Sequence, residues 1–108
     1  MIKKVALFIG LLITTNLFAQ ALPTIKLNTP YGNVRAQLIK SGWTPVKQRE
    51  PCIGTFCNIQ RNNGYYETLH CWDMSTAACN FVFANSQGKE IIVVTNFERL
   101  LFNGFRLP

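Results

Sequence analysis

The chain has 108 residues, of which 48% are hydrophobic and 15% are charged, and its formal net charge at pH 7 is +6. This length is enough for one globular domain and excludes two. The basic residues are scattered rather than gathered into a run that would follow a phosphate backbone, so we expect no nucleic-acid partner.

The first 21 residues have the three parts of a secretory signal peptide. Two lysines precede the apolar run Val5–Ile13, and a small-x-small cleavage site ends at Ala21. The apolar run is shorter than the roughly 20 residues that a membrane span needs, and no cysteine follows the site for lipid attachment. We therefore expect cleavage after Ala21, with Ala19 as the alternative, and a single domain over residues 22–108 in the periplasm or outside the cell, without a stable membrane span.

The four cysteines all lie in the expected mature domain, at Cys52, Cys57, Cys71 and Cys79. An even count in a small exported chain predicts two disulfides, and the marginal core of so small a domain needs such bracing. Three connectivities are open, and the local pairs Cys52–Cys57 and Cys71–Cys79 are favoured. A redox site usually has two residues between its cysteines, whereas Cys52 and Cys57 have four. A metal site would have to combine His70 with Cys71, which face opposite sides of a strand; we expect neither site, and no cofactor.

In chain order, the first element is an alternating stretch at residues 24–28, which predicts a short edge strand. An amphipathic helix over about residues 30–41 follows and is the clearest element. Apolar residues recur along it at helical spacing, at Tyr31, Val34, Leu38 and Ile39. Arg35, Gln37 and Lys40 fall on the opposite, polar side.

Capping residues mark both ends of this helix. Thr29 is the expected N-cap, with Pro30 at the first helical position. Gly42 suits the left-handed residue that follows a helix, and Trp43 would then pack back on Leu38 as in a Schellman motif.

The rest of the chain predicts mainly strands. Residues 44–63 show no sustained period and are expected to be irregular, ending in a turn at Asn62-Asn63-Gly64. Strands are expected at residues 65–72, 79–84 and 90–95, with a last one within 100–107. In the first strand the odd positions should share one face, and they are Tyr65, Glu67, Leu69 and Cys71. The order predicts an α+β fold, with one amphipathic helix packed on a three- to four-stranded antiparallel meander and braced by two disulfides.

Two segments resemble a group of small exported bacterial proteins. In residues 29–46 the helix leads into Gly42-Trp-Thr-Pro45, a Gly-Trp-x-Pro motif, and in residues 71–98 Cys79-Asn-Phe-Val-Phe83 is a Cys-x-Phe-x-Phe strand. The resemblance implies an exported α+β protein and is silent on activity. The layout is also loosely similar to one repeat of the β-lactamase inhibitory protein, although this chain has one such unit rather than two.

The side chains favour a binding protein over an enzyme. The chain has one histidine, His70, and no serine in a nucleophile motif. Glu67 and His70 lie three apart on the expected strand and so face opposite sides. We therefore expect no catalytic residues. The alternative is a small secreted hydrolase with an unrecognised site, since a carboxylate pair formed through the fold is invisible in the sequence.

Tyr65 and Tyr66 are the predicted partner-binding residues. They follow the turn at Asn63-Gly64, and adjacent residues of a strand face opposite sides, so one tyrosine should be exposed. Tyrosine is a frequent interface anchor, although alternating aromatic residues of strands usually fill a core. The sequence therefore predicts a small protein-binding module (an inhibitor, an immunity factor or an envelope accessory protein) whose partner is another envelope or secreted protein.

Overall fold

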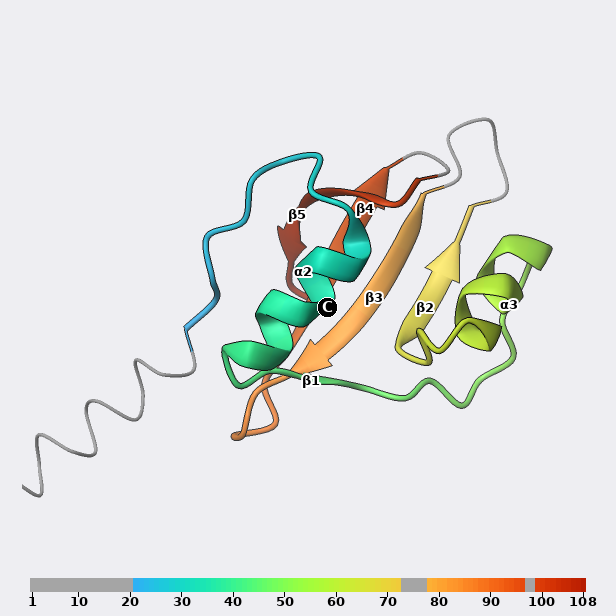
Figure 1. Ribbon diagram of the computed structural model, residues 1–108. Helices are drawn as coiled ribbons and strands as arrows, with labels where there is room; N and C mark the ends of the chain where they lie inside the picture. The colour runs from blue at the N-terminus through green and yellow to red at the C-terminus, as the bar shows by residue number, and fades with distance from the viewer. Residues whose placement is uncertain (1–20, 73–77, 97–98) are drawn as a thin grey trace, which may run out of the picture.

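The structure is a computed structural model that describes residues 21–72, 78–96 and 99–108. Over these ranges the chain forms two helices and a five-stranded antiparallel sheet (Figure 1), which confirms the predicted α+β fold. The elements in chain order are α2 (Tyr31–Lys40), β1 (Thr44–Pro45), α3 (Thr55–Asn62), β2 (Thr68–Cys71), β3 (Cys79–Ala84), β4 (Glu90–Asn96) and β5 (Leu101–Arg106). Nearly all of the expected signal peptide lies outside the described residues, so cleavage after Ala21 stays a prediction.

The sheet is the predicted meander with one short strand added. β2, β3, β4 and β5 pair in sequence order, each antiparallel to the one before. β1 and β2 share the same edge of β3: Pro45 pairs with Phe83 near the end of that strand, and Cys71 pairs with Cys79 at its start. β3 therefore lies at the centre of the fold and touches every strand except β5.

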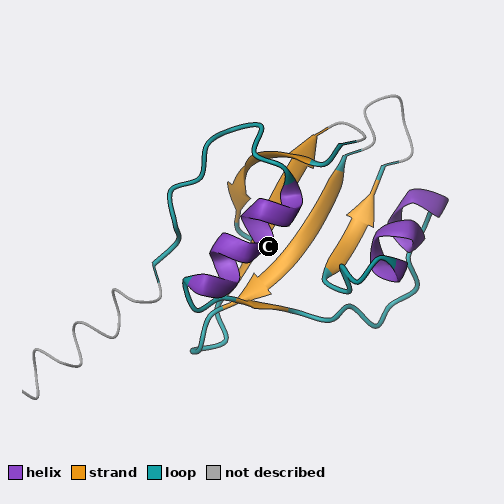
Figure 2. Cartoon of the chain, in the orientation of Figure 1, coloured by secondary structure: helices purple, strands orange, loops and turns teal. Residues whose placement is uncertain are grey.

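One face of the sheet is covered by α2, whereas α3 lies beside β2 at the edge (Figure 2). The helix buries Tyr31, Val34 and Leu38, as predicted, but leaves Ile39 46% exposed. Each helical residue is rotated by about 100° from the one before it. Ile39 therefore lies to one side of the row formed by Tyr31, Val34 and Leu38, which faces the sheet. The sheet contributes the other large buried side chains on this face, which are Phe81, Phe83, Ile91, Val93 and Phe102.

The C-terminal end of α2 confirms the predicted Schellman motif. The backbone N–H of Trp43 donates to the Leu38 carbonyl (3.0 Å), and that of Gly42 donates to the Ile39 carbonyl (3.1 Å). Gly42 has a positive φ of 94°, which a glycine adopts without strain. The Trp43 side chain is only 4% exposed and joins the core.

The N-terminal end of α2 differs from the prediction. The Thr29 hydroxyl donates to the Lys26 carbonyl (2.7 Å) rather than capping the helix, and Pro30 occupies the N-cap position without a side-chain cap bond. The stretch 24–28 is not a strand. Instead, the backbone N–H of Asn28 donates to the Phe102 carbonyl of β5 (2.9 Å), and that of Tyr31 donates to the carbonyl of Leu100 (3.0 Å), the residue before β5. The chain leading into α2 therefore lies along β5.

Residues 44–63, expected to be irregular, contain β1 and α3. The predicted turn at Asn62-Asn63-Gly64 is the end of α3, where the N–H of Tyr65 donates to the Gln60 carbonyl (3.0 Å) and that of Gly64 to the Arg61 carbonyl (3.0 Å). This is a second Schellman motif, with Gly64 at a φ of 100°. The helix was missed because it is short and the positions it buries are Cys57 and Gln60 rather than an apolar series.

The two local disulfides are confirmed. Cys52–Cys57 joins the segment before α3 to the first turn of that helix, and Cys71–Cys79 links the directly paired ends of β2 and β3, with Cα atoms 5.8 and 4.1 Å apart respectively. Two disulfides fit an oxidising compartment. Of the helices in the described ranges, none has the length and apolar character to cross a membrane.

Candidate functional site

Tyr65 and Tyr66 do not lie on a strand, contrary to the prediction. They occupy the connection between the end of α3 and β2, which begins only at Thr68. They still differ in environment: Tyr65 is partly buried and packs against the core, whereas Tyr66 is 39% exposed. The alternation expected for residues 65–71 also fails, because the pairing of β2 with β3 shifts register between Thr68 and His70. Leu69 is therefore 38% exposed instead of sharing a buried face.

Behind the tyrosines lies a fully buried carboxylate, that of Glu67. It accepts a hydrogen bond from the Tyr31 hydroxyl and two from Arg35, at 2.7 Å from Nε and 3.3 Å from Nη2. Tyr31 and Arg35 are one helical turn apart on α2, so both side chains reach the same point of the neighbouring connection. Arg35, expected on the polar side of the helix, thus makes a fork-like ion pair with Glu67.

The electrostatics of this group favour one fixed protonation state. Burial, together with the charge and hydrogen bond of Glu67, raises the pKa of the Tyr31 phenol, which therefore stays a neutral donor. The hydrogen bond to Glu67 raises the pKa of Arg35, which stays charged. The carboxylate has a full set of partners, and breaking such a buried pair is strongly destabilising.

The rings of Tyr65 and Tyr66 flank the same guanidinium. Arg35 Cζ lies 5.6 Å from each ring centroid, within cation–π range. Tyr65 also packs edge-on against Tyr31, with centroids 4.9 Å apart. We call these residues the Arg35 cluster, and its members are Tyr31, Arg35, Tyr65, Tyr66 and Glu67.

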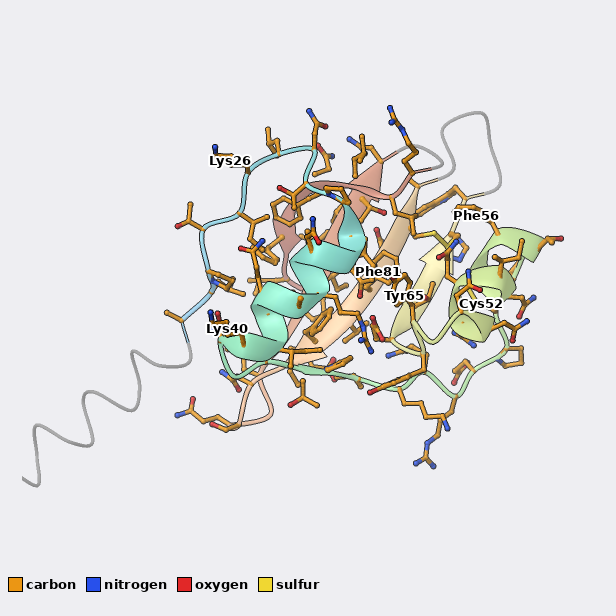
Figure 3. The ribbon with its side chains drawn as sticks, viewed as in Figure 1. Lys26, Lys40, Cys52, Phe56, Tyr65 and Phe81 are labelled. Carbon is orange, nitrogen blue, oxygen red and sulfur yellow. A yellow bond between two sulfur atoms is a disulfide. The ribbon has the colours of Figure 1, made fainter. Side chains whose placement is uncertain are left out.

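Two neighbours place the inner tyrosines of the Arg35 cluster. Tyr31 stacks on Phe81 of β3, with ring centroids 3.6 Å apart, and Figure 3 shows Phe81 and Tyr65 side by side between α2 and β2. The Tyr65 hydroxyl approaches α2 so closely that a Cβ added at Gly32 would lie 3.2 Å from it. Tyr65 is thus a core-facing residue, and Tyr66 is the member that offers an exposed aromatic ring.

The chemistry available at the Arg35 cluster is that of contact rather than proton transfer. Glu67 is buried behind its partners, while Arg35 keeps 22% of its side chain exposed. The bonds to Glu67 use two of the five guanidinium N–H donors, and Cζ of the guanidinium lies 5.6 Å from the centroid of the exposed Tyr66 ring. The sequence analysis missed Tyr31, Arg35 and Glu67 as a group. The available signal was an acidic residue within an expected strand, together with a tyrosine and an arginine four apart on the expected helix.

The histidine considered for metal or catalysis lies elsewhere. His70 packs edge-on against Trp72, with ring centroids 4.5 Å apart, and its neighbour Cys71 is in a disulfide. Among the residues that the structure describes, no three His, Cys, Asp or Glu side chains are grouped to hold a metal ion.

Comparison of the chain with protein-family models, curated proteins and solved structures finds no match. The resemblance to small exported bacterial proteins and to a repeat of the β-lactamase inhibitory protein therefore stays a prediction. The contacts of the Arg35 cluster and the two disulfides are the features that bear on function.

Proposed function

We propose that this protein is a small exported module that binds another envelope or secreted protein, with Tyr66 as the anchor of the contact surface. The observation that carries the proposal is the exposed ring of Tyr66 beside the guanidinium of Arg35. Tyrosine and arginine are the residue types, together with tryptophan, that most often dominate the binding energy of interfaces.

The surface is held in one arrangement before any partner arrives. Glu67, which also accepts a hydrogen bond from the Tyr31 hydroxyl, fixes Arg35 from the buried side, and the Arg35 guanidinium lies beside the Tyr66 ring. The backbone carbonyl of Tyr66 is fixed as well, because it accepts a hydrogen bond from the N–H of Gln48 (3.0 Å). A contact residue that is already ordered loses less conformational entropy on binding.

Export supports a partner in the same compartment. The signal peptide expected over residues 1–21 directs the chain across a membrane, and disulfides form and persist in the periplasm or outside the cell. An inhibitor of a secreted enzyme, an immunity factor and an envelope accessory protein all fit a module of this size.

The test compares Tyr66→Ala with two controls in affinity capture from envelope and culture fractions, followed by quantitative mass spectrometry. Tyr66→Phe keeps the ring, and Leu27→Ala removes an apolar side chain that is 65% exposed on the N-terminal segment. We expect Tyr66→Ala to lower the affinity for the captured protein by about tenfold or more, and both controls to retain it.

Stability decides how a loss of binding is read. Tyr66→Ala should change the free energy of unfolding by no more than about 0.5 kcal/mol, because the ring is exposed. If Tyr66→Ala destabilises the fold while capture persists, Tyr66 is a packing residue and the proposed surface is wrong. If the wild type captures no protein that Tyr66→Ala fails to capture, the proposed binding function is wrong.

A further inference from the structure

The guanidinium of Arg35 uses only one of its two edges within the chain. Its Nε and Nη2 donate to the Glu67 carboxylate, at 2.7 and 3.3 Å. A guanidinium is planar and its N–H donors have fixed directions, so a carboxylate held between Nε and Nη2 leaves Nη1 directed away from it. Over residues 21–72, 78–96 and 99–108, no oxygen accepts a hydrogen bond from Nη1 of Arg35. The edge formed by Nη1 and Nη2 is therefore open to a ligand from outside.

This open edge is held in a fixed orientation. Glu67 is fully buried and binds the guanidinium from the inner side, while Arg35 keeps part of its side chain exposed. The rings of Tyr65 and Tyr66 flank the guanidinium, each with its centroid 5.6 Å from Cζ. A binding group that is already ordered loses less conformational entropy when it meets its ligand.

The shape of the open edge fits a carboxylate. Nη1 and Nη2 each direct one N–H to the same side, and the two parallel donors match the two oxygens of a carboxylate in a bidentate pair. A single carbonyl oxygen offers no second acceptor at the other donor. The side chains of aspartate and glutamate supply both.

The charge around Arg35 favours such a ligand as well. α2 carries two basic residues, Arg35 and Lys40, and no acidic residue. Glu67 compensates the charge of Arg35 from its buried side and presents no carboxylate to solvent. The chain has a formal net charge of +6 and remains basic after loss of Lys3 and Lys4 with the expected signal peptide. A basic surface attracts acidic partners and repels basic ones.

Exposed apolar groups next to Arg35 favour a protein side chain over a small free anion. Ile39 is exposed on α2 and lies four residues after Arg35, and residues four apart on a helix are neighbours. The exposed ring of Tyr66 lies beside the guanidinium. A free anion would leave both side chains in water. A carboxylate on a polypeptide brings neighbouring residues that cover them.

Resting on the function proposed above, we propose that the partner presents an aspartate or glutamate side chain to Nη1 and Nη2 of Arg35, with an apolar neighbour packed against Tyr66 and Ile39. Arg35 then lies between two carboxylates: the buried one of Glu67 orients it, and the one from the partner binds it. A protein without an acidic residue at this point would cover the Nη1 donors and leave them without an acceptor, which is unfavourable. Arg35 thus selects among the proteins that Tyr66 could contact.

The first test uses a random-peptide phage library, selected on protein purified in the form that its cell produces. We expect the enriched peptides to share an aspartate or glutamate beside an apolar residue. In a synthetic copy of an enriched peptide, exchange of the acid for asparagine or glutamine should weaken binding by about tenfold or more. This comparison leaves the protein unchanged, so an altered fold cannot explain the result.

The second test changes the protein. Arg35→Lys keeps a positive charge for Glu67 but lacks the second pair of parallel donors. It should weaken binding of the acidic peptide by about tenfold and remove most of its preference over the amide form. Arg106→Lys makes the same exchange at an exposed arginine of β5 and should leave both unchanged.

The outcomes separate this contact from the proposed function. Peptides without a shared acid, or acid and amide forms that bind equally, overturn the carboxylate contact. So does saturable binding of inorganic phosphate at Arg35 when no acidic peptide is selected. An envelope protein that Tyr66→Ala loses, but that binds Arg35→Lys as tightly as the wild type, overturns the contact and leaves the proposed function standing. Acidic peptides that depend on Arg35, with no protein captured from the envelope, support the contact and contradict the proposed function.

Discussion

The two helices of this protein end in the same way and are held by different forces. Each closes with a Schellman motif in which a left-handed glycine is followed by an aromatic residue, Gly42-Trp43 for α2 and Gly64-Tyr65 for α3. α2 is held by its buried apolar residues, which pack on the sheet, and by the hydrogen bonds of the Arg35 cluster. α3 fully buries only Cys57 and Gln60, packs its partly buried Phe56 against the core, and is also attached by a disulfide and by hydrogen bonds of one arginine. The difference shows that a helix end is specified locally, whereas its docking is not.

The bonds of α3 to the sheet come from Arg61. Its Nε donates to the Thr68 carbonyl of β2 (3.0 Å), and its Nη1 donates to the Glu50 carbonyl (2.6 Å). Ile59, on the same helix, is 45% exposed. Apart from the partly buried Phe56, α3 contributes only Cys57 to the apolar core. We therefore expect its attachment to depend mainly on Arg61 and on the Cys52–Cys57 disulfide, whereas α2 is held mainly by its buried apolar residues.

The largest expected effect concerns the polar attachment of α2. Glu67→Ala should lower the free energy of unfolding by about 3–5 kcal/mol, because it leaves Arg35 and the Tyr31 hydroxyl without their buried partner. Chemical denaturation measures this change. Glu90→Ala, at an exposed glutamate, is the matched control and should stay within about 0.5 kcal/mol of the wild type. Equal effects of the two substitutions would show that the buried carboxylate contributes nothing to stability.

The disulfides separate the core from α3. By loop-closure entropy each short bridge contributes roughly 2–3 kcal/mol. Cys71→Ala with Cys79→Ala should destabilise the whole domain more, because that bridge joins two core strands. Cys52→Ala with Cys57→Ala should mainly loosen α3.

Hydrogen exchange resolved by residue, together with melting temperature, distinguishes these two effects. In the variant with Cys52→Ala and Cys57→Ala, the amides of α3 should lose protection from exchange while those of β3 and β4 keep it. Comparable melting shifts and uniform loss of protection in both variants would contradict the ranking.

A smaller effect should appear at alkaline pH and involve α2 alone. The pKa of Tyr31 is raised in the folded protein, whereas an unfolded tyrosine titrates near pH 10. Above that pH the unfolded chain loses the proton that the native state keeps, so stability falls as pH rises, by up to about 1.4 kcal/mol per pH unit.

Tyr31→Phe lacks this titration and is the matched variant. The stability advantage of the wild type over Tyr31→Phe should be constant below about pH 9 and shrink between about pH 10 and 11. Denaturation at a series of pH values measures it, and the groups that titrate in both proteins cancel in the difference. An advantage that does not change with pH would mean that the Tyr31 phenol titrates normally.

The smallest expected effect tests the feature that the helices share. Gly42→Ala and Gly64→Ala should each lower stability by about 1–2 kcal/mol, since both residues have a positive φ that alanine adopts only with strain. A steric clash cannot cause the effect at Gly64, because an added Cβ there would meet nothing within 4 Å. A change at Gly42 without one at Gly64 would show that the end of α3 relaxes at no cost.

The sequence predicted the parts of the fold that local chemistry determines. The apolar spacing of Tyr31, Val34 and Leu38 indicated α2, and Gly42-Trp43 indicated its end. Four strands and the two local disulfides followed from alternation, β-branched residues and short cysteine spacings. The same reasoning found Gly64 as a turn but not the helix before it, because α3 has only eight residues, too few to show a sustained period, and one of its two buried positions is the polar Gln60.

The Arg35 cluster was out of reach for a different reason. Glu67 lies in the connection before β2, where its backbone carbonyl accepts a hydrogen bond from the N–H of Val82 (3.1 Å). Arg35 meets the Glu67 side chain only because α2 packs over this point of the sheet. No short stretch of sequence encodes either of these two long-range contacts. Tyr66 was found as an exposed aromatic residue, although the premise that it lies on a strand was wrong.

The position of Arg61 has a consequence for the solubility of the chain. β2 borders the sheet next to α3, and a border strand with free carbonyls is a template on which another chain can add a strand. Arg61 engages the Thr68 carbonyl and α3 packs against the strand, so the border is capped. Since Cys52–Cys57 ties α3 in place, we expect this bridge to protect the chain from aggregation as well as to brace the fold, and a chain reduced at these two cysteines to expose the edge of β2 more often.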